Sequence, residues 1–486
     1  SATEQLAHMR RLAMQTLINI GDRDRDTILG AARDPDWQVR RLGTMALGNL
    51  PLDGANVDNL AVSTFAEQLK DTDFHVRTEA VKIAARLSGR SGDCTTLLTA
   101  TEDTAVPVAL QALDGLSSAC KATEPIHARL HELADSLLDP ASRYPWQTGA
   151  RALTTLARLA PADVRPLIDQ HELQADVRWQ VRAAVATAAG RAKDESVLIA
   201  LSTDQSPNVR TAVLDALRVM ASPQLFPKAI EALDSRDFQL VRTAAMSLKG
   251  APSSNETSMA LVQSLKRLTD DGADTSRDAR VAILERLTEQ NIADMVPLVR
   301  PLLEDFDADV ARAAKGFCER AVPNAEFTIA PKSRRLYQAS LDQVQQLPAG
   351  ATLVMQNGDR IEFDFLVDTP MTVARFVELA NRHYYDGLTL HRFVANFVVQ
   401  GGSPGASEYV GDYRFMRDEL GRGAHLRGAV GISTRGRDTG DAQIFLDLVD
   451  LPRLDHDYTV FAYVRSGLDA MDRVLEGAVI STVVLR

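Results

Sequence analysis

The sequence contains little of what would assign it at once to a membrane or nucleic-acid-binding class. Its 486 residues include three cysteines, which are too few for a disulfide framework. It has no run of about 18 apolar residues of the kind that a membrane-spanning helix requires. The net charge of −11 at pH 7 argues against non-specific binding to nucleic acid, because that binding needs a basic surface. The apolar fraction of 45% and the length are typical of a globular protein with more than one domain.

Metal and phosphate motifs are also sparse. The sequence has no GxxxxGK[ST] loop. His127 and His131 have the i, i+4 spacing of two metal ligands on one helix face, but no third ligand and no HExxH arrangement accompanies them. We therefore expect a solvated or packed histidine pair, no metal site and no cofactor.

From Ser1 to about Ala321 the sequence is helical and repetitive. The pattern reads DPDWQVRRLGTMALGNL from Asp34, DTDFHVRTEAVKIAARL from Asp71 and DQSPNVRTAVLDALRVM from Asp204, with a weaker copy from Ser235. Each copy has an Asp-rich turn, which we expect to cap a helix, and then apolar residues at helical spacing. Anchor arginines recur at roughly 30–40 residues, a period typical of stacked helix pairs, with a gap after Arg77 that degenerate copies fill: Arg40, Arg77, Arg182, Arg210, Arg242 and Arg280.

These copies resemble HEAT repeats. In that family an aspartate and an arginine, here Asp36 with Arg40 or Asp73 with Arg77, typically tie adjacent repeats together. The resemblance implies a solenoid of about ten helix pairs over residues 1–321, a kind of scaffold that offers a long surface to protein partners.

The sequence says little about the cellular compartment of the protein. The chain begins at Ser1 without a methionine, so we expect a processed or trimmed form from which any targeting peptide is already gone. Cys94 and Cys120 lie about one repeat apart and allow a disulfide, but we favour free buried thiols for both.

The periodicity changes after the repeats. Residues 322–350 are predicted to be a linker with one short helix. Asn357-Gly358 within TLVMQNGDRIEFDF is a strong hairpin signal, because both residue types accept positive φ. Pro370, with Thr369 as the expected cap, opens a helix with an apolar stripe, and short strands follow near 429–433, 442–446, 459–464 and 479–485. This order predicts a closed antiparallel barrel with helices at its ends over residues 351–486.

Four blocks in this second part resemble the corresponding blocks of cyclophilins. They are YYDGLTLHRFVANFVVQGGSPG, DELGRGAHLRGAVGIS, DTGDAQIFL and LPRLDHDYTVFAYV. The resemblance implies a multidomain chain in which an all-α solenoid precedes an eight-stranded cyclophilin-like barrel with capping helices. It also implies peptidyl-prolyl cis-trans isomerase (rotamase) activity and a role in protein folding.

The resemblance implies a set of site residues as well. Arg392 is the expected donor to the imide nitrogen, Gln400 orients it, and Phe397 stands at the catalytic centre. The residues expected to bind the substrate are Val398, Phe445, Leu454 and Tyr458 around the proline, and Gln443, Ser433 and Thr434 around the residues before it. His391 and His425 are expected to be structural.

Several positions depart from the family pattern. Arg453 stands where an aromatic residue or a histidine is common, and Thr434-Arg435 replaces small and amide residues of the peptide groove. Asp441-Ala442 stands for Gly-Ser, and Ser403 replaces an aspartate. These changes put substrate preference in doubt more than activity.

Two functions of different classes follow. The first is an isomerase that acts on proline-containing protein or peptide clients recruited by the solenoid. The alternative is a proline-peptide-binding scaffold with little or no catalysis, and a principal function in the solenoid itself also stays open. We expect a bacterial envelope location, because bacterial proteins that join HEAT-like repeats to a cyclophilin resemble this arrangement and are often exported.

Overall fold

The structure is a computed structural model that describes residues 2–21, 24–116, 118–120, 123–139, 141–170, 172–290, 293–333 and 336–486. It comprises two compact units. One is formed by residues 1–194 together with the short segment 394–397, and the other by residues 195–393 and 398–486. In the part of the chain that the structure describes, no helix has the length and apolarity needed to cross a membrane.

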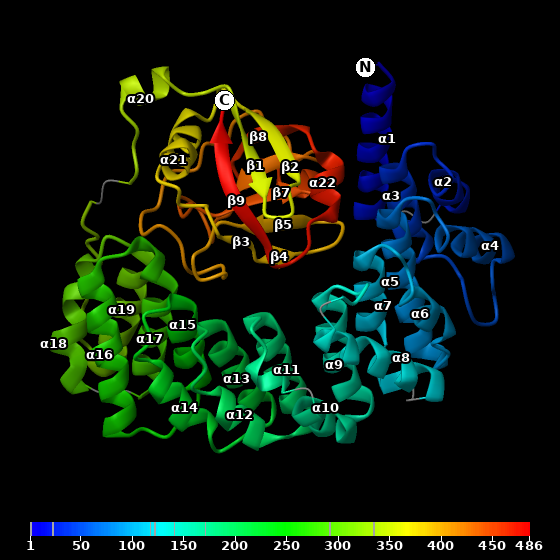
Figure 1. Ribbon diagram of the computed structural model, residues 1–486. Coiled ribbons are helices and arrows are strands. Elements are labelled where there is room, and N and C mark those ends of the chain that lie inside the picture. The colour runs from blue at the N-terminus through cyan, green and yellow to red at the C-terminus, as the bar shows by residue number, and fades with distance from the viewer. Residues whose placement is uncertain are drawn as a thin grey trace. The chain divides into compact units, whose positions relative to one another are not determined.

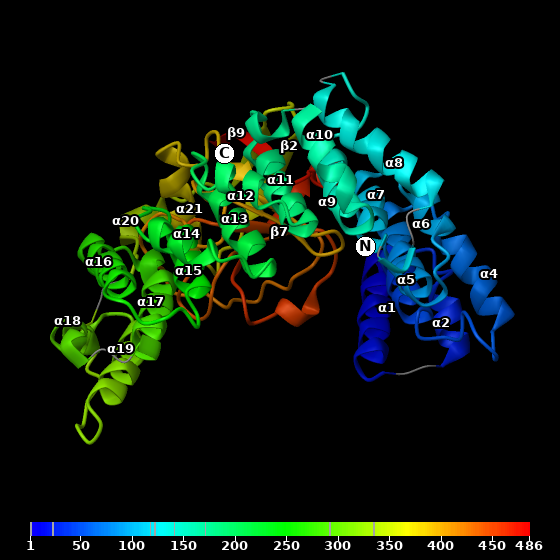
Figure 2. The same ribbon diagram turned by 90° about the horizontal axis from the view of Figure 1, so that it is seen from below.

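The first unit is built of helices that pack in consecutive pairs (Figures 1 and 2). Each pair buries an apolar stripe against its neighbours, as the repeat pattern predicted. The α-helices are α1 (Ala2–Asn19), α2 (Arg25–Ala31), α3 (Trp37–Leu47), α4 (Asn59–Gln68), α5 (Phe74–Ser91), α6 (Thr95–Ala100), α7 (Val106–Gly115), α8 (Glu124–Asp135), α9 (Trp146–Leu159), α10 (Val164–Gln170) and α11 (Trp179–Ala192).

An ion-pair ladder joins successive repeats, although its rungs differ from the expected ones. Asp36 caps α3 by accepting from the Val39 N–H and pairs with Arg11 of α1. The Arg40 guanidinium bonds not the Asp36 carboxylate but Asp71 in the next repeat, at 2.7 Å. The arginine therefore bonds the first aspartate of the following turn, because the second one is occupied by helix capping.

A disulfide joins Cys94 to Cys120, so the preference for two free thiols was wrong. Cys94 immediately precedes α6, and Cys120 ends a short 3₁₀ turn, Ser118–Cys120, after α7. Helical packing brings the two Cα atoms to 5.5 Å, a separation that the 26-residue spacing alone does not reveal. Cys318 is a buried free thiol.

The second unit begins with further helix pairs. They are α12 (Glu195–Leu201), α13 (Pro207–Val219), α14 (Leu225–Ala232), α15 (Phe238–Ser247), α16 (Asn255–Asp271), α17 (Arg277–Gln290), α18 (Val296–Val299) and α19 (Ala308–Ala321). Arg280 of α17 is fully buried and pairs with Asp305 at 2.6 Å. One short helix, α20 (Leu341–Gln345), follows, with a capping box in which Ser340 and Gln343 bond each other's backbone.

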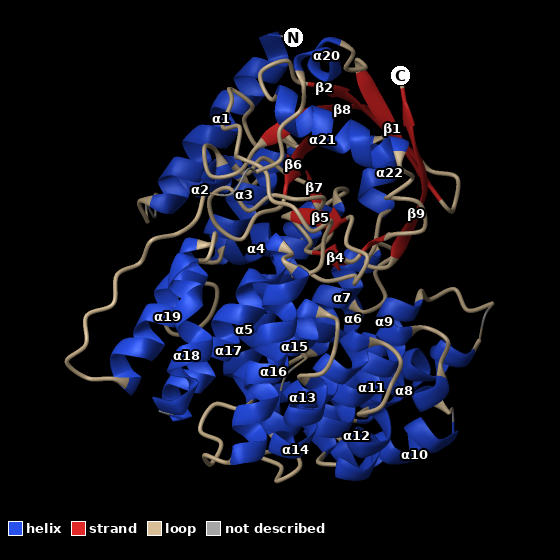
Figure 3. Cartoon of the chain, turned by 90° about the vertical axis from the view of Figure 1, so that its left-hand side faces the viewer, coloured by secondary structure: helices blue, strands red, loops and turns tan. Residues whose placement is uncertain are grey.

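The strands of the second unit form one antiparallel sheet that closes almost completely into a barrel (Figure 3). They are β1 (Gly350–Met355), β2 (Arg360–Phe365), β3 (Thr389–Leu390), β4 (Arg392–Phe393), β5 (Val398–Gly401), β6 (Ala429–Ile432), β7 (Ile444–Asp447), β8 (Val460–Ser466) and β9 (Ala478–Leu485). The order is β3-β9-β1-β2-β8-β6-β7-β5-β4. Because only His391 separates β3 from β4, one bent segment supplies both edges of the sheet and closes it.

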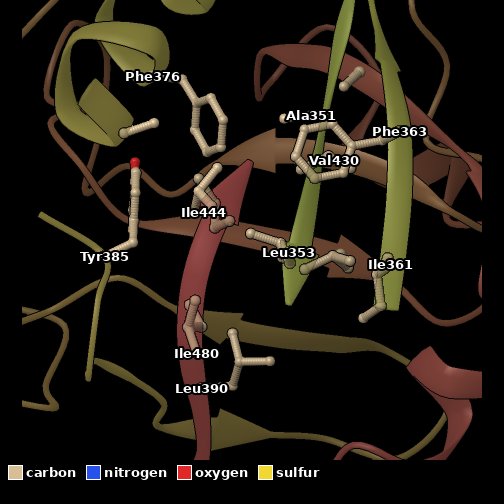
Figure 4. Close-up of a cluster of buried hydrophobic side chains, with 14 of the residues drawn as sticks. Ala351, Leu353, Ile361, Phe363, Phe376, Tyr385, Leu390, Val430, Ile444 and Ile480 are labelled. Carbon is tan, nitrogen blue, oxygen red and sulfur yellow. The ribbon is translucent and has the colours of Figure 1, made fainter. Parts of the chain in front are cut away.

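The barrel interior is filled with aromatic and branched side chains (Figure 4). Phe363 of β2 meets Phe376 and Phe461 edge-on, with ring centroids 5.7 and 6.5 Å apart. Phe376 belongs to α21 (Pro370–Asn381), which packs on the barrel, and α22 (Leu468–Arg473) is the second helix of the barrel part. The closed core holds the strands β4, β5 and β7 in a fixed register.

Two local predictions need correction. The β1–β2 hairpin forms as expected, but only Gly358 of the Asn357-Gly358 pair has positive φ, and the connection is longer than a two-residue turn. Thr369 occupies the N-cap position of α21 without capping it by its side chain. The Glu419 carboxylate accepts the Met371 and Thr372 N–H groups instead, because a charged acceptor suits the positive end of the helix dipole.

Candidate active site

A hydrogen-bonded network of four side chains joins strands β4 and β5 to the residues that follow β6 and precede β7. The antiparallel register sets Arg392 opposite Gln400, and Gln400 opposite Phe445. Arg392 Nη1 donates to Gln400 Oε1 at 3.1 Å. Gln400 Nε2 in turn donates to Gln443 Oε1 at 3.0 Å and to Ser433 Oγ at 2.9 Å. Rigid strands therefore fix the orientation of the guanidinium.

The far end of this network is anchored in a loop. Gln443 Nε2 lies within 3.0–3.2 Å of the carbonyl oxygens of Ser407, Glu408 and Val410. Three acceptors around one amide nitrogen determine which way the Gln443 amide faces. Ser403 braces the same loop, because its hydroxyl donates to the Val410 carbonyl and accepts from the Ser407 N–H. Ser403, which stands where the family pattern has an aspartate, thus supports the loop.

The charge of Arg392 stays within reach of solvent. Its side chain is 39% exposed, and its Nε lies 3.5 Å from the Glu408 carboxylate. The adjacent His391 does not add a second charge at neutral pH, because burial, aided by the Arg392 charge, lowers the pKa of His391 to about 4.

An apolar wall lies on the other side of Gln400. Phe445 and Leu454 are buried and Tyr458 is half-buried, and the Phe445 and Tyr458 rings meet edge-on at 5.9 Å. Phe445 also stacks on His425 at 5.7 Å. Gly431 of β6 lies opposite Phe445, and a Cβ there would approach the ring to 2.4 Å, so this glycine makes room for the phenyl group.

His425 is held from behind by a buried acid. Its Nδ1 is 2.8 Å from Asp447 Oδ2, and both side chains are inaccessible to solvent. Burial raises the pKa of Asp447 to about 6. The pair fixes the imidazole under Phe445 and gives His425 the structural place that was expected for it.

The remaining predicted residues are placed as follows. Val398 begins β5 and is buried, and Thr434 follows β6 and is half-buried. Phe397 immediately precedes β5 and is half-buried, but it lies in the segment 394–397 that groups with the first unit. The structure thus brings Arg392, Gln400, Gln443 and Ser433 together by hydrogen bonds and Phe445 with Tyr458 by ring contact, while the role of Phe397 stays a prediction.

Sequence reasoning missed the partners of Arg435. The Arg435 Nε donates to Asp278 of α17 at 2.7 Å, and its backbone carbonyl accepts from Arg277 at 2.8 Å. Its guanidinium also bonds the Glu408 carbonyl and lies 5.3 Å from the Tyr409 ring. Although burial favours the neutral acid, the Arg435 and Arg277 charges lower the pKa of Asp278. An arginine that looked like an altered groove residue is therefore a tie to the helical repeats.

Other repeats of the second unit hold the same loop. Asp274 donates its N–H to the Tyr413 carbonyl and accepts from the Phe415 N–H, both at 2.8 Å. Asn208 of α13 donates to the Gly405 carbonyl at 2.9 Å, and the Arg242 guanidinium lies 4.5 Å from the Tyr409 ring. Helices α13, α15 and α17 therefore support residues 405–416, which in turn position Gln443.

Comparison with known proteins gives two family matches. Residues 352–484 match the family model described as cyclophilin type peptidyl-prolyl cis-trans isomerase, and residues 170–249 match HEAT repeats. A peptidyl-prolyl cis-trans isomerase of Helicobacter pylori is 39% identical over 140 residues, which are 28% of this chain and 86% of that protein. Peptidyl-prolyl cis-trans isomerase B of Bacillus subtilis is 36% identical over 133 residues, which are 27% of this chain and 93% of that protein.

One solved structure is also similar to part of the chain. The cyclophilin type isomerase of Cryptosporidium parvum aligns with a TM-score of 0.27 and 21% identity, over 29% of this chain and 98% of its own. The relationship to the Helicobacter and Bacillus proteins covers nearly their whole lengths. Through its C-terminal domain, the chain belongs to the cyclophilin-type peptidyl-prolyl cis-trans isomerases.

Proposed function

We propose that the chain catalyses cis–trans isomerisation of X-Pro bonds in protein clients, with Arg392 as the donor to the reacting bond. Rotation about a peptide bond is opposed by about 18–20 kcal/mol, because the nitrogen lends its lone pair to the carbonyl. X-Pro bonds populate both isomers yet exchange in tens to hundreds of seconds. Since no covalent bond breaks, the reaction needs a slot for the proline ring and a donor aimed at the imide nitrogen.

The arginine acts on the transition state more than on the ground state. As the bond twists, the nitrogen becomes pyramidal and regains its lone pair, so a donor placed there lowers the barrier. Arginine suits this role because its guanidinium is planar and always charged. The observation that carries the proposal is the bond from Arg392 Nη1 to Gln400, itself fixed by Gln443, which leaves the partly exposed guanidinium pre-oriented for a substrate.

The other predicted residues have roles that fit this placement. We assign the proline ring to the wall formed by Phe445, Leu454 and Tyr458, with Val398 at its edge, and Phe397 keeps the catalytic role that the resemblance implies. The residues before the proline would lie along Ser433, Thr434 and Gln443, where the Gln443 amide is already oriented by three carbonyl groups. The Glu408 carboxylate beside Arg392 Nε orients the guanidinium from the opposite side.

The decisive experiment measures the exchange rate of a short X-Pro peptide by exchange NMR, with the intact chain and with Arg392→Ala. We expect the substitution to lower kcat/KM by about 100-fold, equivalent to about 2.7 kcal/mol of transition-state stabilisation. Arg465→Ala is the matched control, because Arg465 is an exposed arginine of β8 that pairs with Glu362. If the wild-type chain binds the peptide without accelerating exchange, a proline-peptide-binding scaffold replaces the isomerase.

The proposal extends to the helical repeats, which we expect to recruit the clients. A repeat scaffold offers a long surface, and tethering raises the concentration of client prolines near the active site. The test uses an unfolded polypeptide without proline. This polypeptide should bind the Arg392→Ala variant as tightly as it binds the wild-type chain. It should compete with a protein substrate for binding, but it should not compete with a short peptide. Absence of binding would leave the isomerase proposal intact and remove recruitment by the repeats.

We further propose an oxidising compartment, such as the bacterial envelope. The Cys94–Cys120 disulfide supports it, because disulfides persist in exported proteins and are rare in the reducing cytosol. Fractionation of the producing bacterium, with detection of the chain by antibody, tests the location. Recovery in the cytosolic fraction would contradict it.

A further inference from the structure

Two histidines and an aspartate converge in the first unit, and none of them belongs to the isomerase barrel. His127 and His131 lie one turn apart on α8, and their ring centroids are 4.4 Å apart. The Nε2 atoms of both imidazoles approach the same oxygen, Oδ2 of Asp163, which is 3.2 Å from His131 Nε2. Asp163 ends a 3₁₀ turn, Pro161–Asp163, directly before α10. The third ligand absent from the sequence pattern is thus supplied by the next repeat.

The ligand atoms lie close enough together to share one small divalent cation. One candidate ligand atom from each of the three side chains lies within 4.8 Å of the other two. Bonds of 2.0–2.2 Å from a tetrahedral zinc ion to nitrogen and oxygen place neighbouring ligand atoms about 3.3 Å apart. The distance of 3.2 Å between His131 Nε2 and Asp163 Oδ2 is one such edge. The i, i+4 spacing on α8 supplies the two imidazoles on a single helix face.

The ligand types select the class of metal. Two imidazole nitrogens and one carboxylate oxygen suit zinc and the neighbouring transition metals, whereas magnesium and calcium prefer sites built of oxygen alone. The three side chains are between 28% and 35% exposed, so solvent can reach the point on which they converge. A fourth position is therefore open to water, as in three-ligand zinc sites.

We propose that His127, His131 and Asp163 form a zinc site that ties the α8–α9 helix pair to α10. The Cys94–Cys120 disulfide crosslinks the repeat just before it, so two successive parts of the first unit would be held by a bond stronger than helix packing. Because the site involves no residue of the isomerase chain Arg392–Gln400–Gln443, its loss should leave peptide isomerisation unchanged. It is independent of the proposed function.

A matched control exists in the same chain. His383 and Asp386 form an exposed histidine–aspartate pair with a 3.0 Å contact, and no third metal-binding side chain joins them among the described residues. If the three-residue group formed only ion pairs, it and the His383–Asp386 pair would respond to zinc in the same way. A metal site requires that only the three-residue group bind zinc.

The experiment is calorimetric titration of the full chain, stripped with a chelator, with zinc chloride at pH 7.5 without thiol reductant. We expect one equivalent to bind with a dissociation constant on the order of 1 μM, weaker than structural sites with four ligands. His131→Gln and Asp163→Asn should each weaken binding at least about tenfold. Asp163→His should retain it, and His383→Gln should leave it unchanged. Magnesium and calcium should not compete at equal concentration.

A second readout separates the site from an effect on folding. Zinc should raise the thermal midpoint of the wild-type chain, because a ligand that binds only the folded state stabilises it, and it should not raise the midpoint of His131→Gln. Without zinc, the variants should melt at the midpoint of the metal-free wild-type chain. Every variant should retain peptide isomerase activity. No stoichiometric binding by the wild type, or equal binding by His131→Gln and Asp163→Asn, would overturn the proposal.

Discussion

Arg435 and Asp278 are 157 residues apart in the sequence and form an ion pair of 2.7 Å between the loop after β6 and helix α17. Both side chains are mostly buried, with exposed fractions of 16% and 22%. The same arginine bonds the Glu408 carbonyl, and that carbonyl is one of three that orient Gln443. The helical repeats of the second unit therefore reach the proposed active site through three successive hydrogen bonds.

This connection predicts that Asp278→Asn lowers kcat/KM for an X-Pro peptide several-fold without abolishing activity. Asp278 touches no proposed substrate position, so it acts as a positioning residue. The loss should appear in KM more than in kcat, because Thr434, beside Arg435, shifts while Arg392 keeps its bond to Gln400. The measurement is peptide exchange at several substrate concentrations. A double-mutant cycle with Arg435→Gln should show that the two substitutions are not additive.

The control for this prediction is Arg437→Gln. Arg437 lies two residues from Arg435, is 56% exposed and pairs with Asp457 at the surface, where ion pairs contribute little. Its substitution should leave both KM and kcat at wild-type values. Equal losses from Arg437→Gln and Arg435→Gln would show a general effect of surface charge and contradict the positioning role.

The disulfide gives a prediction about stability. Its 26-residue separation corresponds to about 3.5 kcal/mol in the loop-entropy model. Cys120→Ser should therefore lower the midpoint of thermal unfolding, and reductant should lower the wild-type midpoint to the same value while leaving the variant unchanged. Thiol titration of the denatured wild-type chain should find only Cys318 before reduction. Three reactive thiols before reduction would show that the bond is absent.

The sequence predicted the elements whose signals are local. Repeat periodicity located the helix pairs because each pair buries its own apolar stripe, and the hairpin at Gly358 followed from local turn chemistry. The residues of the proposed site came from the block resemblance. Their hydrogen bonds are then a consequence of strand register, since Arg392 and Gln400 pair directly across β4 and β5.

What escaped prediction involves partners that only tertiary packing brings together. Asp278 reaches Arg435, Asp163 reaches His127 and His131, and Glu419 caps α21. Each of these acids is an ordinary charged residue in its own segment, and neither periodicity nor spacing distinguishes it from its solvated neighbours. The Cys94–Cys120 bond is similar, because its formation depends on how two short helical segments meet.

Acid should destabilise the barrel through His391. Burial lowers its pKa to about 4 in the folded chain, against about 6.5 in an unfolded chain. Between these values the unfolded state binds a proton that the folded state does not, so stability falls as the pH is lowered from about 6.5 to 4. We expect His391→Gln to remove about 2 kcal/mol of this loss, measured as the difference between the two urea unfolding curves from pH 7 to 4.5.

Asp447 must be considered in that measurement, because its raised pKa of about 6 works in the opposite direction. The folded state takes up that proton before the unfolded state does, so lowering the pH through 6 adds stability. The comparison with His391→Gln cancels the contribution of Asp447. Parallel pH profiles for the wild type and the variant would contradict the predicted role of His391.

The buried pair Arg280–Asp305 should be the most sensitive rung of the inter-repeat ladder. Its side chains are 1% and 5% exposed, whereas those of Arg40 and Asp71 are 17% and 9% exposed. Asp305→Asn keeps an acceptor for the Asp307 N–H but leaves the Arg280 charge without its counter-ion, and such a loss costs about 3–5 kcal/mol. Asp71→Asn should cost less, since Arg40 also bonds the Asp34 and Pro35 carbonyls and is more exposed to water.

Replacing both partners, Arg280→Met with Asp305→Asn, should recover most of the stability, because no buried charge remains. Urea unfolding of the three variants measures these differences, and a double variant no more stable than Asp305→Asn alone would show that packing, not charge, sets the cost.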